Sequence, residues 1–267
     1  MYDLHTHSRF SDGRDSAEDM VLEALERGMS RLGISDHSHV PWEEGGMSWE
    51  NTAAFRKEMS RLKERYRNRI SLLCGLERDY YSDDALDYDY IIGSVHCIMM
   101  PDGHPLCVDW EPSMLEEDVK KYFHGDWYAM TEAYYAVEAD VARKTRCNII
   151  GHFDLVTKFN EKGHYWDESD PRYVRAWQGA ADALLKTGAA FEVNTGAISR
   201  GYRTEPYPAR IIREYLWERG ARLILSSDAH RREHLAYGFE ELQGEVRTEN
   251  RNHPTRLRAA DDSGLAF

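Results

Sequence analysis

The sequence predicts a parallel α/β protein that closes into a barrel, and three observations carry this prediction. About seven short apolar, β-branched runs alternate with longer amphipathic stretches along the 267 residues. Each run is followed by a connection long enough to hold a helix, as between parallel strands. Neither a GxGxxG nor a GxxxxGKS/T loop occurs, which disfavours the open nucleotide-binding sheets that carry those loops.

The elements follow from this pattern in chain order. The expected strands are Tyr2–His5, Arg31–Asp36, Ile70–Leu76, Tyr90–Val95, Cys147–Gly151, Ala189–Val193 and Arg222–Ser226. The expected helices are Ser16–Arg27, Trp49–Arg67, Met114–Thr145, Pro171–Thr187 and Pro208–Arg219. Ser16 and Asp19 have capping-box spacing, and Gly28 closes the first helix. Residues 1–247 are predicted to form a single domain, and the polar, aperiodic residues 248–267 a tail.

The composition of the chain limits the partners that the protein can bind and the cell compartment in which it is expected. The net charge of −13, from 47 acidic and 34 basic residues, repels phosphate backbones, so no nucleic-acid partner is expected. The four cysteines are scattered without a framework, and Cys74 and Cys147 are expected to be buried thiols. The sequence shows no signal peptide and no apolar run of about 18 residues. Together with the scattered cysteines, these features predict a cytoplasmic protein without a membrane span. Homo-oligomer formation stays open.

Metal-ligand residues stand at the ends of nearly all expected strands. His5 and His7 end the first strand and Asp228 and His230 the last, and residues two apart in an extended segment point the same way. Single histidines or a glutamate end the strands between them: His37, Glu77, His96 and His152. Seven of the 12 histidines, His39 included, lie at or just past strand ends.

Each of these features alone is ordinary, since most HxH pairs are surface accidents and most strand-end glutamates are solvated. Their accumulation at the carboxyl ends of barrel strands, where active sites lie, predicts a metal centre. Imidazoles and carboxylates are the ligand set for Zn, Mn and Fe. About nine candidate ligands exceed the need of one ion and suit two or three.

These motifs resemble those of the polymerase and histidinol phosphatase (PHP) family. The resemblance lies in Asp3-Leu4-His5-Thr6-His7-Ser8, Ile34-Ser35-Asp36-His37, Gly151-His152 and Ser227-Asp228-Ala229-His230, and runs from Met1 to about Gly238. It implies a distorted seven-stranded TIM-like barrel, (β/α)7, with three metal ions at its mouth. It further implies three ligand sets, namely His5, His7, Glu77 and Asp228; Glu77, His96 and His152; and Asp12, His37 and His230.

Within the family, the chain looks most like the stand-alone histidinol phosphatases, on Gly93-Ser94-Val95-His96 and His39-Val40-Pro41-Trp42. The resemblance implies a phosphomonoesterase that converts L-histidinol phosphate to L-histidinol in histidine biosynthesis. A water bridging two ions would be deprotonated near neutral pH and would attack phosphorus without a phospho-enzyme. Asp228 or His230 would protonate the leaving alkoxide.

Substrate contacts are expected from loops that follow the strands. Arg200, Arg203 and Lys158 would bind the phosphate, arginine through two bonds and lysine as a point charge. Trp42 or Tyr202 would face an imidazole. An ammonium group would favour a carboxylate, for which the candidates are Glu43, Glu44 and Glu205.

Three other functions compete with this hypothesis. The same centre could serve a phosphoesterase acting on nucleotides or on another small phosphoester. A non-catalytic PHP binding module would be expected to lose ligands, whereas here the set is complete. A metallo-amidohydrolase would need a bridging lysine near the end of the fourth strand, where Val95 and His96 stand.

Overall fold

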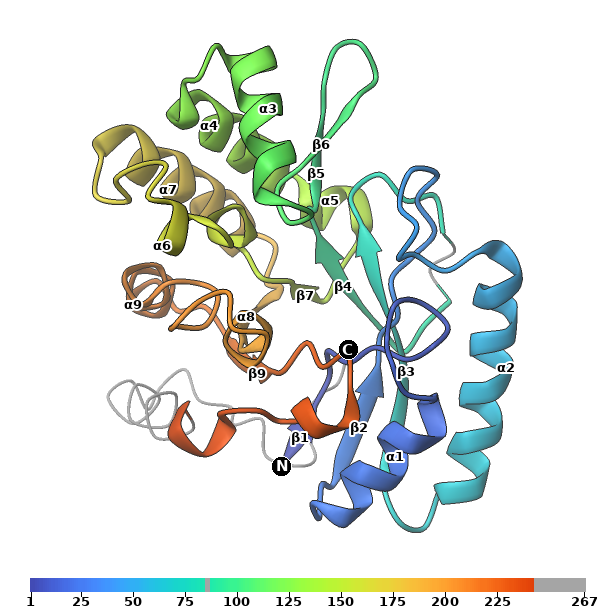
Figure 1. Cartoon of the computed structure of the whole chain (residues 1–267). Coiled ribbons are helices and arrows are strands. Elements are labelled where there is room, and N and C mark those ends of the chain that lie inside the picture. Colours follow the sequence, from blue (N-terminus) through green and yellow to red (C-terminus); the bar gives the residue numbers. More distant parts are fainter. Residues whose placement is uncertain (85–86, 243–267) are drawn as a thin grey trace.

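A computed structural model describes residues 1–84 and 87–242 (Figure 1). The predicted tail, 248–267, lies outside the described residues, as does the end of the predicted domain 1–247, so the single-domain organisation stays a prediction. Within the described ranges, no helix is long and apolar enough to cross a membrane.

Seven parallel strands form a nearly closed barrel, which confirms the predicted fold class (Figure 1). In sheet order the strands are β1 (Tyr2–Asp3), β2 (Arg31–Ile34), β3 (Ser71–Asp79), β4 (Tyr90–Ser94), β7 (Ile149–Ile150), β8 (Ala190–Asn194) and β9 (Leu223–Ser226). A parallel bridge between Thr6 and Ala229 joins the segments that follow β1 and β9. The first and last strands therefore meet, and the carboxyl ends of the strands surround one opening.

The barrel interior below this opening is apolar and is closed by Tyr90. The ring of Tyr90 passes Gly33 and Gly75, where an added Cβ would lie 2.1 and 2.2 Å from its atoms. Its hydroxyl donates to the carbonyl oxygen of Leu4 on the opposite side. These glycines therefore make room for a ring that seals the floor of the site.

Helices surround the barrel (Figure 1). They are α1 (Ala17–Glu26), α2 (Trp49–Tyr66), α3 (Pro112–Phe123), α4 (Trp127–Glu138), α5 (Val141–Thr145), α6 (Asn160–Gly163), α7 (Pro171–Leu185), α8 (Gly196–Ser199) and α9 (Arg210–Glu218), with short 3₁₀ turns η1 (Leu155–Thr157) and η2 (Arg232–His234). The capping box predicted for the first helix is confirmed, because Ser16 Oγ accepts from Asp19 N at 3.1 Å.

The single helix predicted over Met114–Thr145 is wrong, because three helices, α3 to α5, occupy this stretch. His124 and Gly125 adopt left-handed backbone angles, with φ of 55° and 81°, which end α3. Asp126 then caps α4 by accepting from Ala129 N at 3.1 Å. The chain can therefore turn between α3 and α4, whereas one continuous helix would project beyond the barrel.

An antiparallel hairpin, β5 (Cys97–Met99) and β6 (Pro105–Cys107), follows β4 directly. Cys97 and Cys107 stand opposite each other and form a disulfide. The scattered cysteines gave no sign of this pair, because only the strand register brings the two together. Cys74 and Cys147 are free thiols, and Cys74 is buried as expected, whereas Cys147 is only partly buried.

Candidate metal centre

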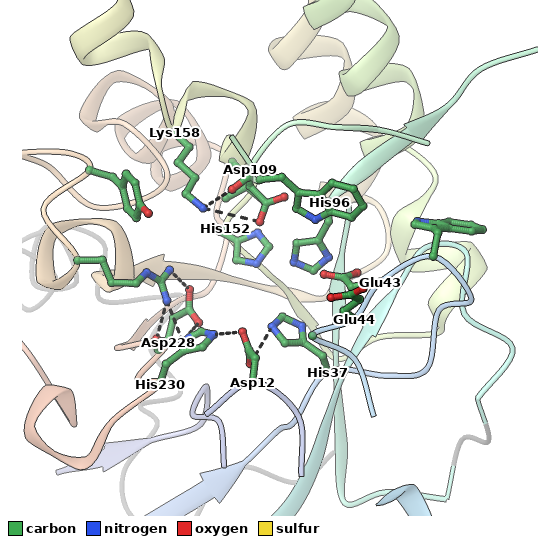
Figure 2. Close-up of a pocket in the computed structure, with 16 residues that line it drawn as sticks. Asp12, His37, Glu43, Glu44, His96, Asp109, His152, Lys158, Asp228 and His230 are labelled. Carbon is green, nitrogen blue, oxygen red and sulfur yellow. Dashed lines mark hydrogen bonds and ion pairs between the residues drawn. The ribbon is translucent and has the colours of Figure 1, made fainter. Parts of the chain in front are cut away.

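All nine side chains predicted as metal ligands lie together at the carboxyl ends of the strands. We call this set the metal cradle: His5, His7, Asp12, His37, Glu77, His96, His152, Asp228 and His230. Figure 2 shows His96 and His152 turned toward the same opening as Asp228 and His230. The barrel thus brings together residues that are up to 225 positions apart in the chain, from His5 to His230.

Glu77 occupies the centre of the cradle and is 1% exposed. Its two oxygens face five histidines at 2.8–3.4 Å: His5, His7 and His37 at Oε2, and His96 and His152 at Oε1. Strand β3 runs longer than predicted, and Glu77 pairs with Ile92 of β4 inside the sheet. The carboxylate is therefore held by the strand itself, in the position of a bridging ligand.

Asp228 and Asp12 complete the cradle. Asp228 Oδ1 lies 3.1 Å from His7 Nε2 and 3.7 Å from His5 Nε2. Asp12 Oδ2 lies 3.0 Å from His230 Nε2. Asp228 has a φ of 50°, so the chain turns sharply just past β9 and directs this side chain inward.

The groupings agree only in part with those that the resemblance implied. His5, His7 and Asp228 form one cluster, and a second joins Asp12, His37 and His230 but also includes His7. His96 and His152 fall in different clusters around Glu77, His96 with His37 and His152 with His5. The centre is therefore more continuous than three separate ligand sets.

Buried atoms of the cradle fit a bound cation. His5 Nε2, Glu77 Oε2 and both ring nitrogens of His7 are buried and have no hydrogen-bond partner among the described residues. His5 Nε2 and Glu77 Oε2 are 3.0 Å apart but do not form a hydrogen bond. Each buried polar atom without a partner lowers the stability of the folded protein by roughly 1–3 kcal/mol. A divalent ion would coordinate several of these atoms together.

The electrostatics of the cradle put Glu77 and His7 in their metal-binding forms. Burial raises the pKa of the Glu77 carboxyl, but the charges of His37 and His5 outweigh it and hold this pKa well below its ordinary value. Burial lowers the pKa of His7 to about 3, and the neighbouring His230 and His37 act in the same direction. An ionised carboxylate beside a neutral imidazole is the ligand form of both groups. Burial lowers the pKa of His37, but the charges of Glu77 and Asp12 outweigh it and raise this pKa to about 10, so His37 would release a proton on binding an ion.

Two buried carboxylates that were not assigned from the sequence hold cradle histidines in place. Glu192 Oε1 lies 2.6 Å from His5 Nδ1, and Oε2 accepts from His152 N at 3.0 Å. Asp79 Oδ2 lies 3.1 Å from His96 Nδ1. A carboxylate at the far ring nitrogen fixes the orientation and tautomer of a metal-binding histidine.

A cavity of about 560 Å³ opens above the cradle. We call the loop residues around it the pocket rim: Trp42, Glu43, Glu44, Asp109, Trp110, Lys158, Arg200 and Tyr202. Figure 2 shows Lys158 beside Asp109, and Glu43 with Glu44 on another side of the opening. The rim therefore has Lys158, paired with Asp109, on one side and the two carboxylates of Glu43 and Glu44 on another (Figure 2).

Three of the four predicted substrate contacts, Lys158, Arg200 and Trp42, line this cavity. Lys158 Nζ donates to the carbonyl oxygen of Asp109 at 2.5 Å, and burial lowers its pKa. Arg200 Nη2 pairs with Asp228 Oδ2 at 2.9 Å, which holds the guanidinium at the edge of the cradle.

Arg203, the fourth predicted contact, is not among the residues that line the cavity. It is 5% exposed, lies 3.5 Å from Asp154 Oδ2 and stacks 4.9 Å from the centre of the Tyr207 ring. Glu205 lies 3.3 Å from Arg203 and is also outside the lining. The expected substrate contact at Arg203 is therefore corrected to a structural ion pair behind the rim.

Comparison with known families agrees with this geometry. The model of the PHP domain matches residues 3–196, which is most of the chain. The chain belongs to the PHP domain family.

Its relatives include proteins with assigned activity. The probable histidinol-phosphatase of Deinococcus radiodurans is 28% identical, covering 92% of this chain and 92% of the relative. The histidinol-phosphatase of Bacillus subtilis is 24% identical, covering 89% and 96%. These relatives and the cradle class the protein as a phosphoric monoester hydrolase that uses divalent metal ions.

Solved structures show the same fold. A crystal structure from Listeria monocytogenes matches with a TM-score of 0.79 at 19% identity, covering 90% of this chain and 99% of that one. The histidinol phosphate phosphatase of Lactococcus lactis, complexed with zinc, L-histidinol and phosphate, matches with a TM-score of 0.65 at 18% identity and covers 93% of each chain.

Proposed function

We propose that the protein hydrolyses L-histidinol phosphate to L-histidinol and inorganic phosphate, as a step of histidine biosynthesis. The observation that carries this proposal is the arrangement of charge around one cavity, with Arg200 and Lys158 on one side and the carboxylates of Glu43 and Glu44 on another (Figure 2). A substrate with a phosphate at one end and an ammonium at the other fits that arrangement. The names of the relatives from Deinococcus radiodurans and Bacillus subtilis support the same substrate.

The cradle would hold two or three divalent ions of Zn, Mn or Fe, with Glu77 as the shared ligand. When bound, such ions lower the pKa of water and offset the charge on the phosphoryl group. His5 would be kept in ligand orientation by Glu192, and His96 by Asp79. These carboxylates also keep the far ring nitrogens of His5 and His96 protonated, while Glu192 fixes the backbone of His152.

Arg200 and Lys158 would bind the phosphoryl oxygens. In this structure Arg200 Nη1 lies 2.8 Å from His230 Nδ1, which also lies 2.9 Å from the carbonyl oxygen of Asp228. If His230 Nδ1 donates to that carbonyl, it cannot accept from Arg200, whose guanidinium then stays paired with Asp228 Oδ2 at 2.9 Å. Asp228 and His230 remain the two candidates for delivering a proton to the leaving oxygen.

The opposite side of the cavity would receive the organic part of the substrate. Burial raises the pKa of Glu43, while the charges of His96 and His37 lower it. A substrate ammonium beside Glu43 or Glu44 would pair with carboxylates that the rim places together. Trp42 and Tyr202 offer aromatic faces for an imidazole ring.

The test is to purify the protein without chelators, measure metals per chain by mass spectrometry and assay phosphate release. Substrates would be L-histidinol phosphate, a panel of mononucleotides and p-nitrophenyl phosphate. We expect kcat/KM for L-histidinol phosphate to exceed the others by about 100-fold, because a site built for a cation rejects substrates without one.

Other outcomes would separate the alternatives. Bound metal with a preferred nucleotide or other phosphoester would keep the catalytic class and reject the substrate. No metal, and no hydrolysis after zinc or manganese is added, would reject the proposed function and favour a binding module.

A further inference from the structure

The disulfide between Cys97 and Cys107 joins two segments that both reach the metal centre. Cys97 directly follows His96, and Cys107 stands two residues before Asp109. Between the two segments, Val108 N donates to the carbonyl oxygen of His96 at 2.9 Å. Because His96 belongs to the cradle and Asp109 to the rim, the disulfide links the two parts of the site.

Each segment is held on its far side by a different contact. The ring of His96 is fixed by Asp79, at 3.1 Å from Nδ1. The backbone of Asp109 is fixed by Lys158, whose Nζ donates to its carbonyl oxygen at 2.5 Å. The disulfide therefore closes a chain of contacts that runs from β3 through the hairpin to η1.

The hairpin has other interactions that would keep it folded without this bond. Ile98 and Leu106 are buried in the large apolar cluster that includes Leu115 of α3. Near the hairpin tip, His104 Nε2 lies 2.9 Å from Asp118 of α3. Opening the disulfide would therefore loosen the base of the hairpin, next to the site, and would not unfold it.

We propose that Cys97–Cys107 is a site of reversible thiol oxidation that tightens the metal centre when the disulfide is closed. In the closed form His96 and Asp109 keep a fixed separation. In the open form the segment 107–110 gains freedom, so metal held through His96 and substrate bound at the rim are both held more weakly. The metal effect concerns the cradle alone, while the substrate effect rests on the proposed function.

The chemistry of opening and closing is ordinary thiol–disulfide exchange. Two thiolates of a dithiol reductant displace the cysteine sulfurs in turn, yielding two protein thiols and an oxidised reductant disulfide. Glutathione disulfide closes the bond in reverse and releases two glutathione thiols. Cys97 and Cys107 are 1% and 5% exposed, so small reagents should react faster than a protein dithiol.

The first experiment compares the wild-type protein with the double variant Cys97→Ser/Cys107→Ser, both loaded with zinc. Free thiols are counted in denaturant, and zinc affinity is measured by competition with a chromophoric chelator. We expect two free thiols in the oxidised wild type. The Kd of the most weakly bound zinc ion should rise roughly tenfold in the variant, which is the low end of the affinity loss expected when a residue that supports a metal ligand is changed. The KM for L-histidinol phosphate should rise about threefold or more, with a smaller change in kcat.

Two controls keep the result interpretable. Cys147→Ser makes the same chemical change outside the hairpin and should leave zinc affinity at the wild-type value. A phosphine reductant, which takes up water to give the phosphine oxide and two protein thiols, should reproduce the double variant in the wild type but leave the double variant unchanged.

Four thiols in oxidised wild-type protein, or equal zinc affinity in the wild type and the double variant, would overturn the proposal. If L-histidinol phosphate is not hydrolysed, the proposed function fails, but the thiol count and zinc affinity still decide this inference. Circular dichroism should show that the double variant is folded. If it is not, the phosphine-treated wild type provides the comparison.

Discussion

The cradle and the rim surround the same cavity but are built differently. Cradle residues such as Glu77 and His152 are buried at strand ends, where backbone pairing fixes their direction. Rim residues such as Glu43, Glu44 and Lys158 lie on loops and are partly or fully exposed. Catalysis and substrate choice should therefore be separable, with the cradle setting the rate for every substrate and the rim carboxylates Glu43 and Glu44 setting the preference.

The largest effect that would test this separation is expected from Glu77→Gln. An amide cannot bridge cations as a carboxylate does, so metal content should fall and kcat/KM should drop by about 10³-fold or more for all substrates. Metal analysis and parallel assays on L-histidinol phosphate and p-nitrophenyl phosphate check this. A variant with full metal content, or with loss on one substrate only, would contradict the assignment of Glu77 to the cradle.

A smaller effect is expected from Glu192→Gln, which acts through His5. The substitution keeps the shape but removes the charge 2.6 Å from His5 Nδ1, so zinc affinity should fall by about 10- to 100-fold. Glu205→Gln is a matched control outside the cavity lining and should keep wild-type zinc affinity. Competition with a chromophoric chelator measures both, and equal affinities would show that Glu192 does not support the centre.

The rim should respond differently. Glu43→Gln should raise the KM for L-histidinol phosphate about tenfold, because a charged hydrogen bond is worth about 1.5–3 kcal/mol, and should change p-nitrophenyl phosphate hydrolysis less than twofold. Glu44→Gln, at a more exposed carboxylate, should have a weaker effect. Equal losses on both substrates would break the distinction between rim and cradle.

The smallest effect concerns Glu138, a buried carboxyl of α4 outside both regions, whose Oε1 has no hydrogen-bond partner among the described residues. Burial raises its pKa well above the ordinary value, although the charge of His96 opposes this. Because the folded state then binds the proton more tightly, the stability from this group is present below the unfolded pKa and is lost as pH rises through the folded one.

Glu138→Gln should therefore stabilise the protein at neutral pH, with a gain that shrinks as the pH falls toward the ordinary glutamate pKa. Thermal unfolding of the metal-free protein at several pH values measures this gain. A gain that grows toward acid would show that the Glu138 pKa is not raised. Glu77 and Glu138 are both buried, but the charges of neighbouring histidines outweigh the effect of burial on the pKa only at Glu77.

Much of the cradle could be predicted because ligands at strand ends follow from a general property of parallel barrels. Once strands are located, their carboxyl ends must meet, and His5 and Asp228 then meet as well. Glu192 and Asp79 were not assigned, although a signal exists. Asp79 stands two residues after Glu77 on a strand whose end was placed too early, and such residues point to the same side.

Which loop residues line the cavity, and which cysteines pair in the hairpin, could not be predicted from local sequence patterns. Arg203 follows the same strand as Arg200, and only the loop path decides that one faces the cavity and the other Asp154. The pairing of Cys97 with Cys107 could be predicted only from the register of the hairpin. The break in the predicted helix, in contrast, did have a local signal, because Gly125 followed by Asp126 is a common helix end and helix start.

The bridge between Thr6 and Ala229 has a consequence for how the protein is made. A ribosome that has delivered the chain only as far as β8 has released His5, His7 and Glu77 but not Asp228 or His230. The nascent chain therefore offers imidazoles to cellular ions before it can enclose them. Full loading has to wait until β9 and the residues that follow it have been made, so a chain terminated before Asp228 would bind ions without becoming an enzyme.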